Sequence, residues 1–312
     1  FDSAQTFVME SGTITASGIG VRLQADSSNF TMNDGYIEAS SHGVYRYGWK
    51  NKTTINNGHI KSLSQTGILM DRSHSNSSYW STLIINDGLI EGAVYGVRNY
   101  STYFTINSGE IRSNSTNRDH YALICDSYSP CTINEEEGKT TLINAPLASG
   151  IYMNSDVKMN AGRIFAGAPS AFGVYQNSCT FTMNSGKLET PGSNALGIVH
   201  DRYDSAFEIN DGEVTSGYIG LYVNNGYDNN RTERIYGGSI IGGTYGIYQN
   251  SGKSTITIGK TDQDLSIKIP YISGGNYGLY KNSGTSNFYN GRLRGYIKGY
   301  NSEFNNIRAD KE

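Results

Sequence analysis

The densest group of titratable side chains in the sequence lies in the segment "HDRYD" at residues 200–204. It places His200 beside two carboxylates, Asp201 and Asp204, and beside the guanidinium of Arg202. An imidazole next to carboxylates has the groups that general acid–base catalysis uses. A surface turn explains the same composition, because charged residues gather where water can solvate them. We favour the turn, and we predict no catalytic residue here.

A second repeated phrase contains a strand-like Gly-aliphatic-Tyr run. In three of its copies an aspartate stands two residues after the position of the tyrosine. These aspartates are Asp71, Asp126 and Asp201. The same position holds asparagine in other copies, namely Asn154, Asn177 and Asn224. Glycoside hydrolysis needs two carboxyl groups about 5–10 Å apart. The three aspartates belong to copies that are not neighbours, so we expect them to lie too far apart to cooperate.

The three cysteines allow two interpretations. Cys125 and Cys131 flank the turn-like segment "DSYSP" and could close a short disulfide in an oxidising compartment, which would leave Cys179 over. Alternatively, all three are small buried thiols. The chain has no paired Cys-x-x-Cys and no histidine at ligand spacing, so we predict no metal site and no cofactor.

Tyrosine follows a Gly-aliphatic pair in many copies of the same phrase. The aligned residues are Tyr45, Tyr152, Tyr175, Tyr222, Tyr248 and Tyr280. Strand alternation should turn them outward, because the aliphatic residue before each is expected to be buried. A column of aromatic rings could then stack on sugar rings. The alternative is that tyrosine simply suits a half-exposed strand, and Leu69, Ile124 and Val199 at the same position favour it.

These residues sit in a repeat that covers almost the whole chain. "FTMNDGYIE" (30–38), "FTINSGEIR" (104–112), "FTMNSGKLE" (181–189) and "FEINDGEVT" (207–215) are copies of one phrase. The turn glycines of the copies are Gly12, Gly35, Gly58, Gly88, Gly109, Gly138, Gly162, Gly186, Gly212 and Gly238, with a later copy at Gly291. The spacing of roughly 25 residues predicts about twelve structural repeats.

Each repeat contains an apolar run, an Asn-x-Gly turn, a short strand, a loop and the Gly-aliphatic-Tyr strand. Apolar residues alternate with period two, as in Phe30 and Met32, and no stretch shows a sustained helical period. Three short strands per repeat, stacked on those of the next, predict an all-β, right-handed parallel β-helix. We expect one domain over residues 1–312, with 298–312 as a C-terminal cap or a junction.

The turn residues have an architectural interpretation. Glycine supplies the positive φ that the corner needs. We expect the preceding asparagines to form a ladder whose amides satisfy backbone groups left unpaired at the bend: Asn33, Asn56, Asn86, Asn107, Asn134, Asn160, Asn184 and Asn210. The aliphatic residue after each turn should point inward: Ile14, Ile37, Ile60, Ile90, Ile111, Ile164, Leu188, Val214 and Ile240.

With these repeats, the chain resembles the parallel β-helix superfold of pectate lyases, phage tailspikes, autotransporter passengers and adhesin-like surface proteins. In style it is most similar to the bacterial and archaeal adhesin-like proteins. The resemblance implies a secreted or cell-surface rod of adhesin or stalk type. The alternative it implies is a polysaccharide-acting lyase or glycoside hydrolase. The Asn-Thr-Asp, Asp-Asp and Gly-His-Gly elements of polygalacturonases are not found.

Composition narrows the class of partner. A formal net charge of −3 and the lack of a basic cluster argue against nucleic acid. No apolar run reaches the length of a membrane span. The resemblance, and not this composition, implies an extracellular or cell-surface location. The expected partners are glycans or the surface of another cell, together with further domains or a second copy at the ends of the rod.

Overall fold

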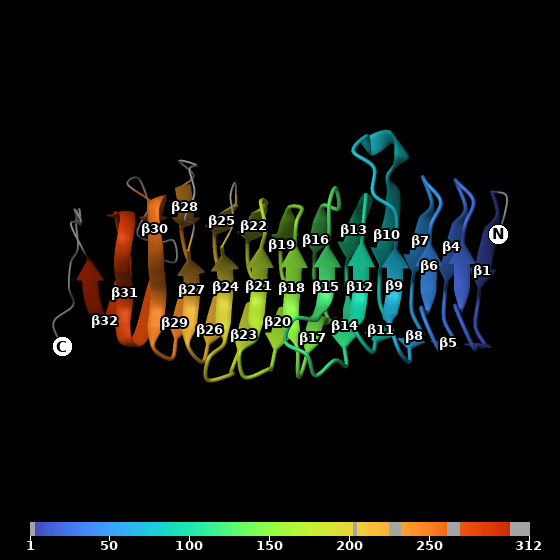
Figure 1. Ribbon diagram of the computed structural model, residues 1–312, viewed down its shortest axis with the longest axis horizontal. Helices are drawn as coiled ribbons and strands as arrows, with labels where there is room; N and C mark the ends of the chain where they lie inside the picture. The colour runs from blue at the N-terminus through green and yellow to red at the C-terminus, as the bar shows by residue number, and fades with distance from the viewer. Residues whose placement is uncertain (1–3, 202–204, 225–231, 261–268, 300–312) are drawn as a thin grey trace.

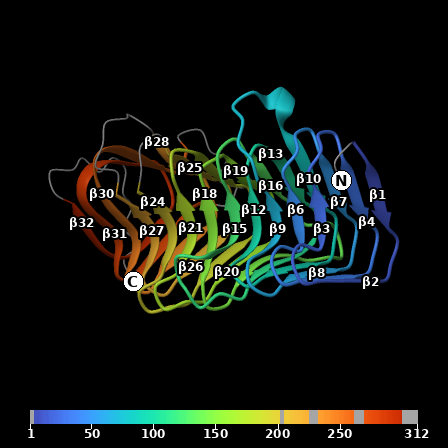
Figure 2. The ribbon, with the colours of Figure 1, turned by 45° about the vertical axis from the view of Figure 1, so that its right-hand side comes forward.

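The computed structural model describes residues 4–201, 205–224, 232–260 and 269–299. They form a parallel β-solenoid of about 11 turns, which confirms the predicted all-β fold and is close to the predicted twelve coils. The strand β1 lies at one end of the rod and β32 at the other (Figure 1). Successive coils lie side by side along the axis (Figure 2).

Each regular coil contributes one strand to each of three faces, which we name A, B and C. Face A consists of β1 (Thr6–Met9), β4 (Asn29–Met32), β7 (Lys52–Ile55), β10 (Ser81–Ile85), β13 (Thr102–Ile106), β16 (Cys131–Ile133), β19 (Val157–Met159), β22 (Thr180–Met183), β25 (Ala206–Ile209) and β28 (Thr232–Ile235). Face B consists of β2 (Thr13–Ala16), β5 (Tyr36–Ala39), β8 (His59–Ser62), β11 (Leu89–Gly92), β14 (Gly109–Ser113), β17 (Thr141–Ala145), β20 (Arg163–Ala166), β23 (Lys187–Thr190), β26 (Glu213–Ser216) and β29 (Ser239–Gly242).

Face C turns toward the viewer in Figure 1. It consists of β3 (Val21–Leu23), β6 (Val44–Arg46), β9 (Thr66–Met70), β12 (Tyr95–Asn99), β15 (Tyr121–Cys125), β18 (Ser149–Met153), β21 (Phe172–Gln176), β24 (Leu196–His200) and β27 (Ile219–Val223). The long strands β30 (Tyr245–Ile258), β31 (Tyr271–Phe288) and β32 (Arg292–Gly299) each continue across more than one face. A 3-10 helix, η1 (Ser77–Tyr79), lies in the loop that protrudes before β10.

The core is built from inward columns that run along the rod. On face B, Ile164 pairs with Leu188 and Leu188 with Val214, and all three are fully buried. The other predicted inward residues of this column are buried as well, except for Ile14, which is partly buried at the end. Ile143, which the repeat analysis did not align, fills the column between Ile111 and Ile164. Similar apolar side chains thus stack from coil to coil, and these stacks fill the interior without a helix.

The predicted corner glycines have positive φ, for example +113° at Gly35 and +99° at Gly186. Gly138 is the exception to their alignment. It lies in an outlying turn where an added Cβ would meet no atom within 4 Å, and Gly109 pairs instead with Thr141. The extra residues before β17 place Gly138 outside the column of corner glycines. The sequence spacing therefore predicted the wrong register for this one coil.

The corner asparagines form a continuous hydrogen-bonded ladder. Asn56 Nδ2 donates to Asn33 Oδ1 at 2.7 Å, and the same bond recurs in each later coil up to Asn210 Nδ2 and Asn184 Oδ1 at 2.9 Å. Asn33 continues the ladder to Glu10 Oε2 at 2.6 Å. The partners are therefore neighbouring side chains, not the backbone groups that we expected. Such amide ladders fix the register of stacked coils.

Two predicted features fall partly outside the described residues. Of the expected cap at 298–312, only Lys298 and Gly299 are described, and they end β32. The segment "TITIGKTDQDLSIKI" at 255–269, a degenerate copy of the repeat between those of Gly238 and Gly291, includes residues 261–268, which also lie outside.

Candidate functional site

The predicted tyrosine column lies on the outer side of face C. Tyr152 pairs with Tyr175, and Tyr222, Tyr248 and Tyr280 follow one another in successive coils. Tyr45 stands apart from them, because Leu69, Arg98 and Ile124 occupy the intervening coils. All six tyrosines are half-buried. The column is thus divided into a single residue, a pair and a triplet.

The rings within each group face one another. The Tyr248 and Tyr280 centroids are 4.9 Å apart with planes at 12°, and those of Tyr152 and Tyr175 are 5.9 Å apart at 9°. Tyr222 and Tyr248 are more tilted, at 5.5 Å and 43°. Parallel rings this close cover each other's faces. The surface of the column therefore presents ring edges, whereas stacking on a sugar needs a free face.

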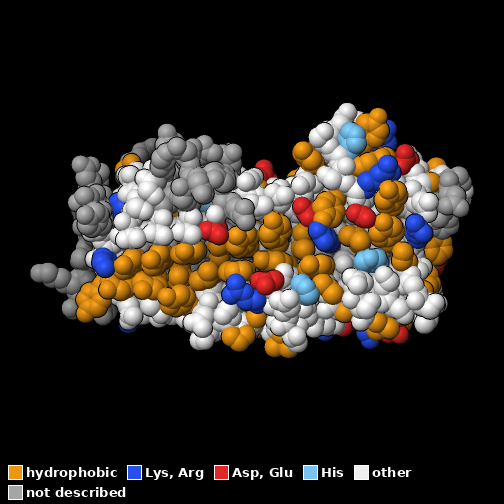
Figure 3. Space-filling view, in the orientation of Figure 1, with side chains coloured by type: hydrophobic (Ala, Val, Ile, Leu, Met, Phe, Trp, Pro, Cys, Tyr) orange, Lys and Arg blue, Asp and Glu red, His pale blue; other side chains and the backbone are white. Residues whose placement is uncertain are grey.

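A second aromatic column, which the sequence analysis did not identify, runs beside the first. Tyr245 and Tyr277 stack at 5.6 Å with planes at 8°, and Tyr277 contacts Tyr296 at 6.1 Å. Phe172 packs against Tyr175 at 5.3 Å. We name the two columns together the tyrosine strip, with the members Tyr152, Phe172, Tyr175, Tyr222, Tyr245, Tyr248, Tyr277, Tyr280 and Tyr296. Figure 3 shows the band of hydrophobic side chains that it forms across this face.

Glycine separates the two columns because the next coil leaves no space. A Cβ at Gly173 would lie 2.5 Å from Leu188 Cδ2 and 2.6 Å from the Gly197 carbonyl oxygen. Gly197, Gly220 and Gly246 are confined in the same way. The spacing Tyr-Gly-x-Tyr in "YGIY" and "YGLY" is therefore the sequence signal for paired aromatic columns.

Burial affects the pKa of three tyrosines of the strip. It raises the pKa of Tyr222, Tyr245 and Tyr248 above the ordinary value. Burial, together with the hydrogen bond to Asp71, raises the pKa of Tyr45 to about 12. These phenols are neutral at physiological pH, and they are poor proton donors.

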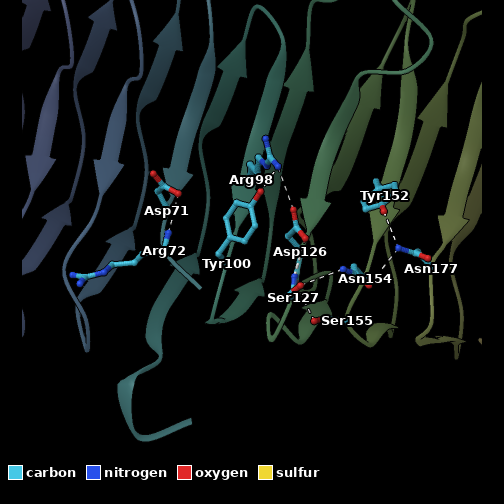
Figure 4. A network of polar contacts seen from close by, with 10 residues as sticks. All are labelled: Asp71, Arg72, Arg98, Tyr100, Asp126, Ser127, Tyr152, Asn154, Ser155 and Asn177. Atoms are coloured by element: carbon cyan, nitrogen blue, oxygen red, sulfur yellow. Dashed lines mark hydrogen bonds and ion pairs between the residues drawn. The ribbon is translucent and has the colours of Figure 1, made fainter. Parts of the chain in front are cut away.

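A polar row follows the tyrosine strip where each strand of face C turns toward face A. It contains the three predicted aspartates and, in other coils, asparagines; Asp71, Asp126, Asn154 and Asn177 of this row are labelled in Figure 4. Asp71 Oδ2 accepts from Tyr45 Oη at 2.9 Å, and Asp201 Oδ2 accepts from Tyr175 Oη at 3.2 Å. Asp126 lies 3.3 Å from Arg98 Nη2. Each carboxylate is therefore engaged by a neighbouring side chain.

The asparagines of the row form a second ladder. Asn282 Nδ2 donates to Asn250, Asn250 to Asn224, and Asn224 to Asp201, at 2.8–2.9 Å. Asn177 Nδ2 donates to the Tyr152 hydroxyl at 3.0 Å. Asp126 and Asp201 have the coils of Asn154 and Asn177 between them, so they lie three coil spacings apart, or roughly 14 Å. That separation exceeds the range for a pair of catalytic carboxyls, whereas Asp71 and Asp126, with only the coil of Tyr100 between them, are two coil spacings or roughly 10 Å apart, at the upper limit of that range.

We expected a surface turn at "HDRYD", but the side chain of His200 does not lie at the surface. This side chain is fully buried and points into the core, where its Nδ1 lies 2.6 Å from Glu233 Oε1. Glu233 Oε2 accepts from the Phe207 amide at 2.8 Å. Arg202 and Asp204 lie outside the described residues. The core side chain of His200 is thus separated from Asp201, which faces the polar row.

The three cysteines are buried free thiols, so the disulfide between Cys125 and Cys131 is not formed in this structure. Cys131 stands in the inward column between Phe104 and Val157, where it takes the place of an apolar side chain. Burial raises the pKa of the Cys125 thiol, and burial raises that of Cys179 to about 12.

Comparisons of the chain with protein-family models, curated proteins and solved structures give no match. Within the described ranges, no group of three histidine, cysteine or acidic side chains could hold a metal ion. In the same part of the chain, no helix has the length and apolar character needed to cross a membrane.

Proposed function

We propose that the chain is a rigid rod of adhesin or stalk type, secreted or held at a cell surface. The observation that carries the proposal is the continuity of its ladders. Backbone pairing on three faces links each coil to the next in register, the corner asparagines add side-chain bonds from Asn33 to Asn210, and the tyrosine strip adds ring contacts within its pair and its triplet. A polypeptide built this way resists bending.

The dimensions suit a spacer. About 11 coils at 4.8 Å give a rod roughly 50 Å long. Each hydrogen bond between coils contributes only about 1 kcal/mol net, but every coil boundary has many of them. The stiff rod would hold a binding surface away from its point of attachment, and its ends would join further domains or a second copy.

The alternative is a polysaccharide-acting enzyme of the β-helix type. The polar row is the place where its carboxylates would lie. The bonds of Asp71, Asp126 and Asp201 to tyrosine and arginine favour a structural role for all three. We therefore rank the rod above the enzyme.

Two measurements test the proposal together. Antibody against the purified chain should label intact cells of the source organism without permeabilisation. The purified protein should release no reducing ends and no unsaturated product from neutral or acidic polysaccharides. Labelling that requires permeabilisation would contradict the location, and turnover of any polysaccharide would establish the enzyme instead.

A further inference from the structure

Among the residues that the structure describes, the loop 72–80 between β9 and β10 protrudes from the rod, and we name it the knob. It stands out from the rod in Figure 1. Trp80 Nε1 donates to the His74 carbonyl oxygen at 2.7 Å, and His74 is tied in turn to Ser101 by two hydrogen bonds. The chain has two tryptophans, Trp49 and Trp80, and both pack at this knob.

The two sides of the knob differ in charge. On one side, the Arg72 guanidinium lies over the rings of Tyr47 and Trp49 at 4.7 and 4.5 Å, and Lys50 lies over Tyr79. On the other side, no cation of the described chain lies over the ring of Trp80 or of Tyr128. This side is open at Tyr128, which is 44% exposed, whereas the ring of Trp80 packs against that of Tyr103 at 4.9 Å.

That open side borders a groove of about 500 Å³, within the range of small-ligand sites. Its aromatic wall is formed by Trp80 and Tyr128, whose centroids are 6.1 Å apart. Its polar wall consists of the side chains of Ser127, Asn154, Ser155 and Asp156. Ser127, Asn154 and Ser155 gather at this turn in Figure 4, at the edge of the polar row.

Tyr128 is an unusual residue for its place. Its φ is +61°, in the left-handed region that bulky side chains adopt only at a cost. The equivalent corners of other coils have φ of +59° at Ser27, +57° at Lys50, +44° at Ser101 and +61° at Ser178. Serine thus satisfies the same corner. The ring of Tyr128 is 44% exposed.

We propose that this groove binds an uncharged pyranose unit of a glycan. The apolar face of the sugar ring would stack on the aromatic wall, and its hydroxyls would bond to the amide, hydroxyls and carboxylate opposite. Asp156 Oδ1 accepts from the Thr180 amide at 2.8 Å, which leaves Oδ2 with acceptor capacity. The lining has one carboxylate and no lysine, arginine or histidine, so an acidic sugar is excluded.

The Trp49→Phe variant leaves Trp80 as the single tryptophan of the chain, so tryptophan fluorescence then reports on Trp80 alone. In this background, neutral hexasaccharides of the cello-, xylo-, manno- and chito- series are titrated against Trp80 emission, with hexagalacturonate as the acidic comparison. At least one neutral series should give a saturable change at millimolar concentration or below, and hexagalacturonate should give none.

Variants then assign the binding to the groove by calorimetry. Tyr128→Ser keeps the corner and should weaken binding roughly three- to tenfold, and Trp80→Ala should weaken it at least about tenfold. Tyr47→Ala, on the cation-covered side, is the matched control and should bind as the parent does. If Trp80→Ala fails to fold, the affinity of Tyr128→Ser still tests whether the groove is the binding site.

The proposal is overturned if no neutral series binds or if hexagalacturonate is the preferred ligand. It is also overturned if Tyr128→Ser binds as tightly as the parent. The site does not depend on the rod function, since cell-surface labelling and groove binding are measured separately.

Discussion

At the scale of single residues, the inward columns carry the stability of each coil. Leu188 is fully buried between Ile164 and Val214. Leu188→Asp would bury an unpaired charge, and it should cost more than about 3 kcal/mol of unfolding free energy. Lys187→Ala, at an outward position of the same strand, should stay within about 0.5 kcal/mol. A melting temperature for Leu188→Asp within about 2 °C of the parent would show that this column is not the core.

A second prediction concerns His200 and Glu233. Each of these buried polar side chains compensates for the burial of the other. Glu233→Ile alone should cost about 3–5 kcal/mol, since it leaves the imidazole without its partner. The neighbouring coils use Val223 and Ile256 at the corresponding positions. The double change His200→Val with Glu233→Ile should therefore cost less than the single one in urea unfolding. Additive losses would mean that the two side chains are not coupled.

At the scale of elements, the tyrosine strip is a stack between strands. Replacing Tyr152 and Tyr175 by alanine should destabilise the protein, and a double-mutant cycle should give a coupling of about 0.5–1.5 kcal/mol for the stacked rings. Glycan binding should be unchanged. A large loss of binding with stability intact would instead return these rings to the sugar-stacking role.

The sequence predicted the strands of each coil well, because period-two alternation and the Asn-x-Gly turn repeat with the backbone. It predicted that Tyr152 and Tyr175 face outward, but not that their rings cover each other. Ring orientation depends on the side chain one coil away and on the hydroxyl partners Asp201 and Asn177. The register predicted at Gly138 was wrong for a similar reason. An inserted loop changes the spacing of glycines along the sequence but leaves the stacking of the coils unchanged.

The knob and its groove could not be predicted from the repeat. Trp80, Tyr128 and Asp156 belong to three different coils, and none of them lies in a repeated phrase. Only the stacking of coils brings them together. The signal in the sequence was the long step between Gly58 and Gly88, which marks an insertion but not its partners.

At the scale of the whole molecule, the central claim is a rod whose coils are locked in register. The outward column of face B passes from Thr15 through Glu38, Lys61, Glu91, Arg112, Asn144, Phe165 and Glu189 to Thr215. Thr15 and Thr215 are therefore eight coil steps apart, or about 38 Å along the axis.

Spin labels on Thr15→Cys and Thr215→Cys measure that distance directly by pulsed electron resonance. The native thiols should not compete, because they are buried and the pKa of Cys179 is raised to about 12, which keeps it protonated. A register-locked rod predicts a narrow distribution centred at about 35–42 Å. A centre below about 30 Å, or a distribution spread over many coil spacings, would contradict the account.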